Sequence, residues 1–436
     1  MKAKPIREVI AQILTDLEKD ETYLQLALKK ELDQLEGKDK SFANEVIYGT
    51  IKWRLRLDYI INQFSKTPVK KMKPLVRSIM RMSVYQLLFL DKVPASAVIN
   101  EAVKIMHKRK MSNLAGFING TLRNIERQKD TITYPSLSVY YSIPEWIIDR
   151  WVEAYGEEKT KLICESLSQR AKICIRTNTL KITKEALKVE LEKEGIEILE
   201  EGFVPESFYI KTGLGIHHSP SYKAGLWTVQ DESAMLVGHV LAPQKGERIL
   251  DMCSAPGGKT THLAALMENE GEVVGCDVHE HKIELIEKNA TRLGTTIIKG
   301  TLQDGLVECK EWIGQFDKVL LDAPCSGLGI MKRKPDIRYT KDDTAIKEIN
   351  EIQKGLMDQA VKYLKEDGIL VYSTCTLTRE ENQDMVIYAK ELGLKTDSIP
   401  FNLPECLKSE VHDNAYIEIL PYLEETDGFF IARFRK

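Results

Sequence analysis

The sequence has few of the features that would place it in a membrane, a disulfide scaffold or a zinc ribbon. Its 436 residues contain eight scattered cysteines without a C-x-x-C pair, which argues against both a structural zinc site and a disulfide framework. No apolar run approaches the roughly 18 residues of a membrane helix. Arg7, Glu8 and Asp16 interrupt the N-terminal apolar pattern, which therefore does not resemble a signal peptide. We predict a cytoplasmic protein with no membrane segment and no metal site.

The chain also lacks a large net charge, but its charges are unevenly distributed. The formal net charge is −3, whereas residues 51–130 contain 17 Lys and Arg against 5 Asp and Glu, a local charge of +12. Such a segment favours a polyanion as partner, and a solvated basic helical surface is the ordinary alternative. Apolar residues make up 43% of the chain, so cores of normal size can form, and the length suits two or three domains.

Apolar periodicity predicts three regions of different character. Residues 1–140 are expected to be all-helical, because apolar residues recur there at helical spacing, for example at positions 9, 10, 13, 14 and 17. In residues 141–235, a β-rich run over Lys172–Asn178, a helix over Thr183–Glu194 and two short strands predict a small α+β module like an RNA recognition motif. Such modules often bind RNA on their sheet, and a linking or substrate-positioning role fits this region equally well.

Residues 236–436 alternate strands with helices, which predicts a Rossmann-like α/β domain. We expect a mostly parallel sheet of seven strands, with ligands bound at the carboxyl ends of the strands. The two last apolar runs, Tyr416–Leu420 and Gly428–Phe434, are expected to form an antiparallel hairpin at one edge.

The stretch 251-DMCSAPGGKTTHLA-264 is the glycine turn after the first of these strands. Its Gly-Lys-Thr resembles the end of a triphosphate-binding loop, but Cys253 occupies the position where that loop needs glycine, and Pro256 has no N–H to offer a phosphate. Asp277 ends the next strand, 19 residues after Gly258, at the spacing of a carboxylate that binds ribose hydroxyls. A ribose site without a G-x-G-x-x-G phosphate clamp favours S-adenosylmethionine over NAD. Asp304 is predicted to contact the adenine.

Two further motifs each place a cysteine after a predicted strand: 321-LDAPCSGLGIMKRKPDIRY-339 and 371-VYSTCTLTREEN-382. Carbon 5 of cytosine is a poor nucleophile until a thiolate adds at carbon 6, so Cys325 and Cys375 beside a nucleoside cofactor suggest covalent activation of a cytosine. Asp322 is the candidate for stabilising the adduct near N3. Free cysteines are more often small buried apolar residues, and the residues alone leave open which of the two would be the nucleophile.

These motifs resemble those of RNA cytosine-5 methyltransferases, and the domain order resembles the RsmB (Sun) family, which methylates a cytidine of 16S ribosomal RNA. Residues 84–105 and 115–125 resemble the NusB-like helical domain of that family. The resemblance implies that Cys375 is the nucleophile, that Cys325 assists product release, and that Asp322 lies between cofactor and base. It also implies a cofactor site formed by Cys253, Ser254, Ala255, Pro256, Gly257, Gly258, Lys259, Asp277, Asp304 and Asp322. Ser254 stands where family members often carry alanine.

The expected partner is 16S ribosomal RNA, free or in a partly assembled small subunit, and a monomer is favoured. Four basic residues after the Pro-Cys motif are predicted to contact phosphates beside the target base, with ordinary solvated charge as the alternative: Lys332, Arg333, Lys334 and Arg338. Three other functions remain possible from the sequence: an RNA-binding factor without activity, a cytosine-5 methyltransferase acting on another RNA, and a methyltransferase acting on another base or on protein. An Asn/Asp-Pro-Pro-aromatic turn, common in N-methyltransferases, is absent.

Overall fold

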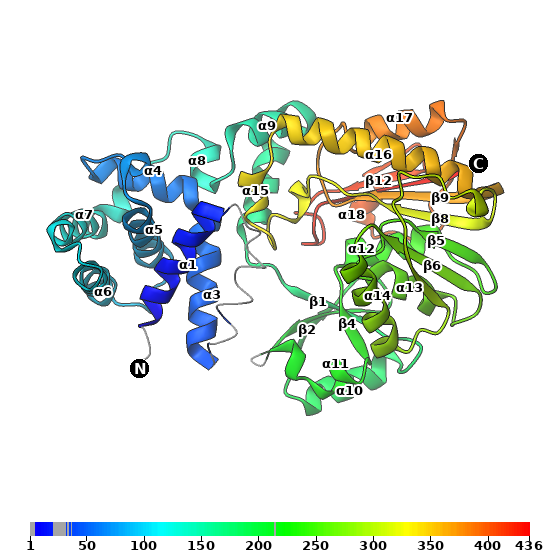
Figure 1. Cartoon of the computed structure of the whole chain (residues 1–436), viewed down its shortest axis with the longest axis horizontal. Coiled ribbons are helices and arrows are strands. Elements are labelled where there is room, and N and C mark those ends of the chain that lie inside the picture. Colours follow the sequence, from blue (N-terminus) through cyan, green and yellow to red (C-terminus); the bar gives the residue numbers. More distant parts are fainter. Residues whose placement is uncertain (1–4, 21–31, 33–34, 36, 213–214) are drawn as a thin grey trace. The chain divides into compact units, whose positions relative to one another are not determined.

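The computed structural model describes residues 5–20, 32, 35, 37–212 and 215–436. The chain forms two compact units (Figure 1). The first contains the residues up to Cys164 together with Lys334–Thr340, and the second contains Glu165–Arg333 and Lys341–Lys436. No helix in the described ranges is long and apolar enough to cross a membrane.

The described part of the first unit is helical, as predicted from its apolar periodicity. Its α-helices are α1 (Ile6–Asp20), α3 (Gly37–Lys52), α4 (Arg54–Phe64), α5 (Pro74–Phe89), α6 (Ala95–Lys108), α7 (Ala115–Gln128), α8 (Leu137–Tyr141), most of α9 (Glu145–Ser168) and α15 (Ile337–Thr340). Its 3-10 turns are η1 (Val69–Lys71), η2 (Ser112–Leu114) and η3 (Lys129–Thr131). The predicted apolar face of α1 is buried through Ile10, Ile13 and Leu14, and each such side chain stabilises the fold by about 1.5–3 kcal/mol.

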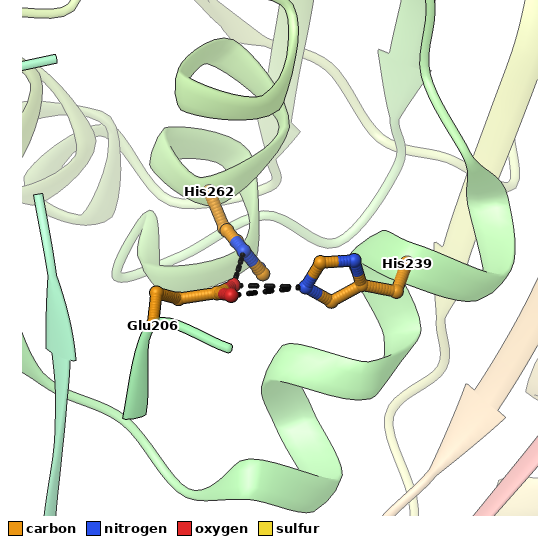
Figure 2. A group of neighbouring side chains, drawn as sticks. All are labelled: Glu206, His239 and His262. Carbon is orange, nitrogen blue, oxygen red and sulfur yellow. Dashed lines mark hydrogen bonds and ion pairs between the residues drawn. The ribbon is translucent and has the colours of Figure 1, made fainter. Parts of the chain in front are cut away.

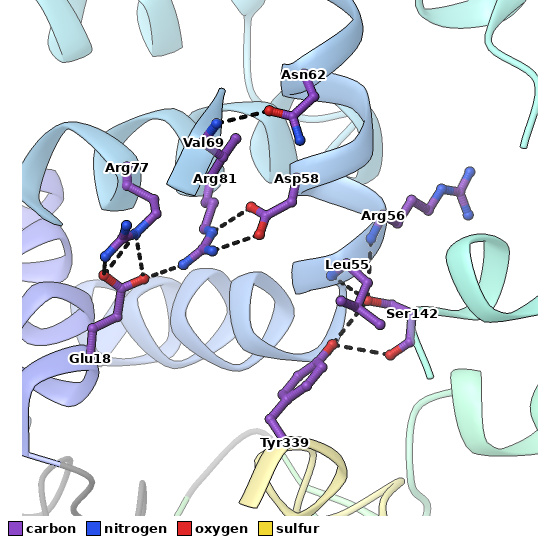
Figure 3. A network of polar contacts seen from close by, with 10 residues as sticks. All are labelled: Glu18, Leu55, Arg56, Asp58, Asn62, Val69, Arg77, Arg81, Ser142 and Tyr339. Carbon is purple, nitrogen blue, oxygen red and sulfur yellow. Dashed lines mark hydrogen bonds and ion pairs between the residues drawn. The ribbon is translucent and has the colours of Figure 1, made fainter. Parts of the chain in front are cut away.

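An ion-pair network between α1, α4 and α5 uses part of the basic charge of this unit (Figure 3). Arg81 lies between Glu18 and Asp58, with 2.6 Å between its Nε and Asp58 Oδ1, and Arg77 Nη2 lies 2.7 Å from Glu18 Oε2. These two arginines are therefore engaged within the protein. Lysines in the connection between α4 and α5 are instead exposed: Lys66, Lys70, Lys71 and Lys73.

Residues 334–340, which follow the Pro-Cys motif, belong to the first unit through buried contacts. Arg338 is 0% exposed, and its Nη1 donates to the backbone carbonyls of Lys52 (3.2 Å) and Ser142 (3.1 Å). The Tyr339 hydroxyl lies 3.0 Å from Ser142 Oγ (Figure 3), and the Arg54 guanidinium stacks 3.7 Å from the centre of the Tyr339 ring. The expectation that Arg338 faces RNA phosphates is thus corrected, because its guanidinium donates hydrogen bonds to carbonyl groups inside the protein.

The second unit contains a four-stranded antiparallel sheet in the order β2-β3-β1-β4. Its elements are β1 (Ile173–Thr177), α10 (Lys184–Lys193), β2 (Glu197–Glu201), β3 (Ser207–Lys211), η4 (Ile216–His218), α11 (Pro220–Lys223) and β4 (Trp227–Val229). The predicted α+β module is confirmed, and β4 is an addition that the sequence pattern did not indicate.

Both faces of this small sheet are covered. On one face, Ile175 packs with Leu187 and Leu191 of α10. On the other face, Cys174 and Tyr209 pack with Met235 of α12 (Glu232–Leu241). An RNA recognition motif binds bases on an open sheet face, and in this module the equivalent face is part of the interior.

The large sheet of the second unit has nine strands in the order β11-β12-β13-β9-β8-β5-β6-β7, with β10 paired to β13. The strands are β5 (Arg248–Asp251), β6 (Glu272–Asp277), β7 (Ile298–Leu302), β8 (Phe316–Asp322), β9 (Leu364–Thr374), β10 (Lys395–Thr396), β11 (Val411–His412), β12 (Tyr416–Ile419) and β13 (Phe429–Arg435). The expected count of seven is corrected, because β10 and β11 are two-residue strands that leave no periodic pattern. The parallel core and the antiparallel β12–β13 pair are confirmed, although β13 also pairs with β9 and so lies inside the sheet.

Helices cover both faces of the large sheet (Figure 1). The apolar sides of α16 (Asp343–Tyr363) and α17 (Gln383–Glu391) pack on one face, and those of α12 and α13 (Gly258–Leu266) pack on the other. The remaining elements are α14 (Glu280–Leu293), α18 (Glu405–Lys408), η5 (Lys310–Trp312) and η6 (Leu328–Ile330). Since β5 is central, with β6 and β8 on either side, the loops after these strands meet at one rim.

Candidate active site

The glycine turn after β5 opens directly into α13. Gly257 has φ 95°, a left-handed conformation that residues with a Cβ rarely adopt. A Cβ on Gly258 would meet nothing within 4 Å, so the backbone faces open space there. Ser254 anchors the turn to the neighbouring strand, because its N–H and its hydroxyl both donate to the Cys276 carbonyl, at 2.8 and 3.0 Å. The turn is therefore a fixed, open cradle at the first turn of a helix.

The acids predicted to hold the nucleoside differ in their surroundings. Asp277 ends β6 beside the turn and is 8% exposed, with Oδ1 accepting from the His279 N–H at 3.1 Å and an ion pair to Lys282 at 3.3 Å. Asp304 follows β7, is exposed and accepts from the Leu306 N–H at 2.9 Å. An open glycine turn beside a strand-end carboxylate, without a phosphate clamp, fits S-adenosylmethionine. Asp277 lies beside the glycine turn, where it can bind the nucleoside. The Asp304 carboxylate instead caps its own turn, through the Leu306 N–H.

Asp322 and Lys259 form an ion pair at the centre of the rim. Lys259 Nζ lies 2.7 Å from Asp322 Oδ2, and the Ser373 hydroxyl donates to Oδ1 at 2.8 Å. Burial lowers the pKa of Lys259, but the Asp322 carboxylate outweighs it, so the pKa is raised and the ammonium stays charged. A Cys375 thiolate also raises this pKa, which places the Lys259 ammonium where it stabilises negative charge on that sulfur.

The two predicted cysteines are brought together across 50 residues of sequence. Sγ of Cys325, after β8, lies 3.2 Å from Sγ of Cys375, after β9, and the Cys375 N–H donates to Cys325 Sγ at 3.3 Å. The hydrogen bond to Cys375, together with burial, raises the pKa of Cys325 well above its ordinary value. Cys325 is therefore a neutral thiol at neutral pH.

Asp251, at the end of β5, is a rim residue that the sequence analysis did not assign. It is 1% exposed and accepts from the Thr260 hydroxyl at 2.7 Å. Burial raises its pKa to about 7. Its position at the start of the glycine motif could have predicted that it lies in the site, because acids at the ends of neighbouring parallel strands meet at one rim of the sheet.

A buried arginine from the middle module, also not predicted, supports the cofactor turn from behind. Arg176 of β1 is 2% exposed, and its guanidinium donates to the Gly258 carbonyl at 2.8 Å, to Thr261 Oγ1 at 3.1 Å and to Gln230 Oε1. Burial lowers the pKa of Arg176 to about 9, so it remains a cation at neutral pH. The covered face of the small sheet thus holds the first turn of α13.

Glu206, His239 and His262 form a second buried group beside α13 (Figure 2). Their ligand atoms lie within 4.8 Å of one another, a composition that can hold a metal ion. However, Nε2 of His239 and of His262 lie 2.9 and 2.5 Å from Glu206 Oε1. Metal ligation would need the Nε2 lone pairs and would move the His262 ring proton to Nδ1, which is buried and unpartnered among the described residues. The geometry therefore favours a hydrogen-bonded network that joins the middle module to α12 and α13.

The four predicted RNA-contacting residues lie in different environments. Lys334 is exposed and Lys332 is half-buried. Arg333 bridges Asp231 and Asp427 at 2.6 and 2.7 Å, so its charge is compensated within the protein. With Arg338 buried in the first unit, only Lys334 has the full exposure expected of a phosphate contact.

Comparison with known families and structures agrees with this architecture. The protein-family model described as 16S rRNA methyltransferase RsmB/F matches residues 238–435. The NusB family model matches residues 4–127, and the family model of the ferredoxin-like domain of RsmF/B-like methyltransferases matches residues 143–217. The crystal structure of PH0851 superimposes with a TM-score of 0.80 at 26% identity, covering 100% of this chain and 99% of the other. A methyltransferase homologue from Pyrococcus horikoshii covers 70% of this chain and 100% of its own, with a TM-score of 0.59 at 31% identity.

Relatives with reviewed names match over the full length. The chain is 38% identical to the probable ribosomal RNA small subunit methyltransferase B of Bacillus subtilis (strain 168), over 100% of both chains. It is 31% identical to ribosomal RNA small subunit methyltransferase B of Escherichia coli O1:K1 / APEC, over 100% of this chain and 99% of that one. The chain therefore belongs to the family of ribosomal RNA small subunit methyltransferases B.

Proposed function

We propose that this methyltransferase transfers a methyl group from S-adenosylmethionine to carbon 5 of a cytidine in 16S ribosomal RNA. The observation that carries the proposal is the pair of cysteine sulfurs 3.2 Å apart at the rim that also holds the glycine turn. A methyl transfer to nitrogen or oxygen needs no thiol, whereas activation of a pyrimidine carbon does. Bound S-adenosylmethionine supplies the methyl group, and the turn from Cys253 to Lys259 with Asp277 would hold it.

Cys375 is the proposed nucleophile. Its thiolate adds to carbon 6 of the cytosine, and a proton at N3 takes up the charge that develops on the ring. Asp322, the proposed residue at N3, is a carboxylate paired with Lys259 in the free protein, so it donates to N3 after it has bound a proton from solvent. Carbon 5 then has enamine character and attacks the methyl group, whose bond to the sulfonium sulfur breaks to leave S-adenosylhomocysteine. A base removes the proton from carbon 5, the sulfur–carbon 6 bond breaks, and Cys375 leaves as a thiolate.

The surroundings of the two sulfurs support this division of roles. Lys259 lies where it can stabilise a Cys375 thiolate, and the raised pKa of Cys325 keeps that residue protonated. A protonated Cys325 beside the adduct can donate to Cys375 sulfur as the carbon–sulfur bond breaks, which is the proposed assistance to release. A Cys375 nucleophile also agrees with the assignment that the sequence resemblance implied.

RNA binding is proposed to involve all three domains, which we assign to residues 1–140, 141–235 and 236–436. The target cytosine has to leave any stack before a thiolate can reach carbon 6. The exposed lysines between α4 and α5 would provide affinity that is independent of sequence and falls with salt. Since the proposed substrate is ribosomal RNA, we place the protein in the cytoplasm, acting as a monomer on free RNA or on an incomplete small subunit.

Product analysis tests the proposal. Unmodified 16S ribosomal RNA is incubated with the protein and methyl-labelled S-adenosylmethionine, and the RNA is digested to nucleosides. Label in 5-methylcytidine with wild-type protein, and none with Cys375→Ser, is the expected result. Label in another nucleoside would overturn the two-cysteine chemistry, and an absence of label with this RNA would direct the search to other RNAs.

A further inference from the structure

A single buried carboxylate lies between the two cysteine loops. Glu381 precedes α17 and is 0% exposed. Its Oε1 accepts from the Ser326 N–H at 2.8 Å and from Gln353 Nε2 at 3.2 Å, and its Oε2 accepts from the hydroxyls of Ser326 (2.5 Å) and Thr378 (2.6 Å). Four donors thus satisfy one buried charge, an arrangement that is costly to disturb.

These contacts reach the residues next to both cysteines. Ser326 directly follows Cys325, and its hydroxyl oxygen lies 2.6 Å from Oγ1 of Thr376, which directly follows Cys375. Because the Ser326 hydroxyl proton goes to Glu381, Thr376 is the donor in this pair. Gln353 also donates to the carbonyl of Pro324 at 2.9 Å, so the chain is held on both sides of Cys325.

The charge of Glu381 also acts on Cys325. The pKa of Cys325 is raised first by its hydrogen bond to Cys375, next by burial and the Cys375 charge, and further by the Glu381 carboxylate. A negative group at this place therefore opposes ionisation of Cys325.

We propose that Glu381 is a positioning residue for the cysteine pair, holding the loops of Cys325 and Cys375 in register. The same carboxylate opposes ionisation of Cys325. The inference rests on the proposed function, in which the two sulfurs have different tasks. Glu381 touches neither sulfur in the contacts described above, so it acts through Ser326 and Thr376. A displacement of about 1 Å at a reacting group can lower a rate about 10²-fold.

Glu232 provides a matched control within the same unit. It is 1% exposed, and its carboxylate accepts from the Val204 N–H (2.9 Å) and from the hydroxyls of Ser207 (2.6 Å) and Tyr209 (2.8 Å). Glu232 is therefore a buried glutamate with the same kinds of donors, but those donors lie in β3 and in the turn before it, and not in the cysteine loops. A general loss of stability should appear in both Glu381→Gln and Glu232→Gln.

The experiment compares wild type, Glu381→Gln, Glu232→Gln and the milder Thr378→Val, which removes one donor to Glu381 and serves if Glu381→Gln does not fold. We expect kcat for methylation to fall about tenfold or more in Glu381→Gln and less in Thr378→Val, with KM for S-adenosylmethionine nearly unchanged. Glu232→Gln should keep kcat near wild type. Equal kcat in the Glu381 and Glu232 variants, or a selective rise of KM for the cofactor, would overturn the proposal.

A thiol measurement separates this inference from the proposed function. In a Cys375→Ser background, the rate of Cys325 alkylation by iodoacetamide is followed against pH by mass spectrometry of its peptide. We expect Glu381→Gln to move the apparent pKa of Cys325 downward and Glu232→Gln to leave it in place. An unmoved profile contradicts the role of Glu381 even if wild type makes 5-methylcytidine. A wild type that makes none would contradict the proposed function while leaving the thiol result valid.

Discussion

Two segments of the catalytic half, both singled out by sequence motifs, behave differently in the folded protein. The ends of β8 and β9 bring Cys325 and Cys375 within 3.2 Å, as expected for neighbouring parallel strands. The basic run that begins at Lys332 is dispersed, with Arg333 in ion pairs and Arg338 buried. Strand order determines where a strand-end residue lies, whereas a cluster of like charges in the sequence does not determine which of its members face solvent.

The cysteine rim should give the largest effects. Cys375→Ser is expected to lower kcat at least about 10³-fold, because it removes the nucleophile. Cys325→Ser should instead retain the covalent link to RNA, seen as a slowly migrating protein–RNA band on a denaturing gel. If Cys325→Ser loses the band and Cys375→Ser keeps it, the roles of the two sulfurs are reversed.

Arg338 should behave as a structural residue despite its place in the basic run. Arg338→Met removes the Nη1 donor to the carbonyls of Lys52 and Ser142 and replaces a fully buried guanidinium, which should cost about 3 kcal/mol of stability. The measurement is chemical denaturation, together with RNA binding at several salt concentrations. A normal stability with a reduced salt dependence would restore Arg338 to the RNA-contacting group.

The network behind the rim predicts a pH dependence of stability. Burial lowers the pKa of His262 to about 4 from an ordinary value of 6.5. Between these values the unfolded chain binds more protons than the folded one, so stability falls as pH falls below about 6.5. The loss at pH 5 should be about 2 kcal/mol for this group.

The variant His262→Gln isolates this contribution. Asp251 and Asp427, whose pKa values burial raises to about 7, change stability in the opposite direction, but they are common to both proteins. The difference in unfolding free energy between wild type and His262→Gln should therefore shrink from pH 7 to pH 5. A constant difference would mean that His262 titrates normally.

Lys334 should give the smallest effect. Neutralising Lys334 should weaken RNA binding a few-fold and reduce the salt slope by about 0.7 for one lost phosphate contact. Arg333→Gln should change the slope less and stability more, because its charge is paired with Asp231 and Asp427. Filter binding at graded salt measures both, and equal slopes for the two variants would remove the distinction between them.

The parts of the fold that followed from the sequence are those with strong local signals. The sequence pattern over 279–293 predicts a helix that ends at Gly294, and Gly294 does end α14 in a left-handed conformation. The apolar pattern predicts a strand over Thr296–Lys299, and β7 lies two to three residues later, at Ile298–Leu302. The three-residue β4 was missed, because a strand that short carries no period.

The middle module shows the limit of assigning function from a domain type. Its strands and helix followed from their periodicity, but the pattern could not show that Cys174, Arg176 and Tyr209 face the interior against α12 and α13. A strand buried on both faces and a strand with an open face that binds RNA can have similar residues, since aromatic and basic side chains suit both.

The order of domains, the cofactor turn and the two cysteine motifs followed from the sequence, because short-range spacing and turn chemistry are local properties of the chain. The fold was needed to show which charges are exposed and that Arg176 supports the cofactor helix. It was also needed to show that Glu381 joins Ser326, 55 residues away in the sequence, to the Cys375 loop. Buried polar groups take whichever partner the packing brings within hydrogen-bonding distance, and that partner leaves no mark in the local sequence.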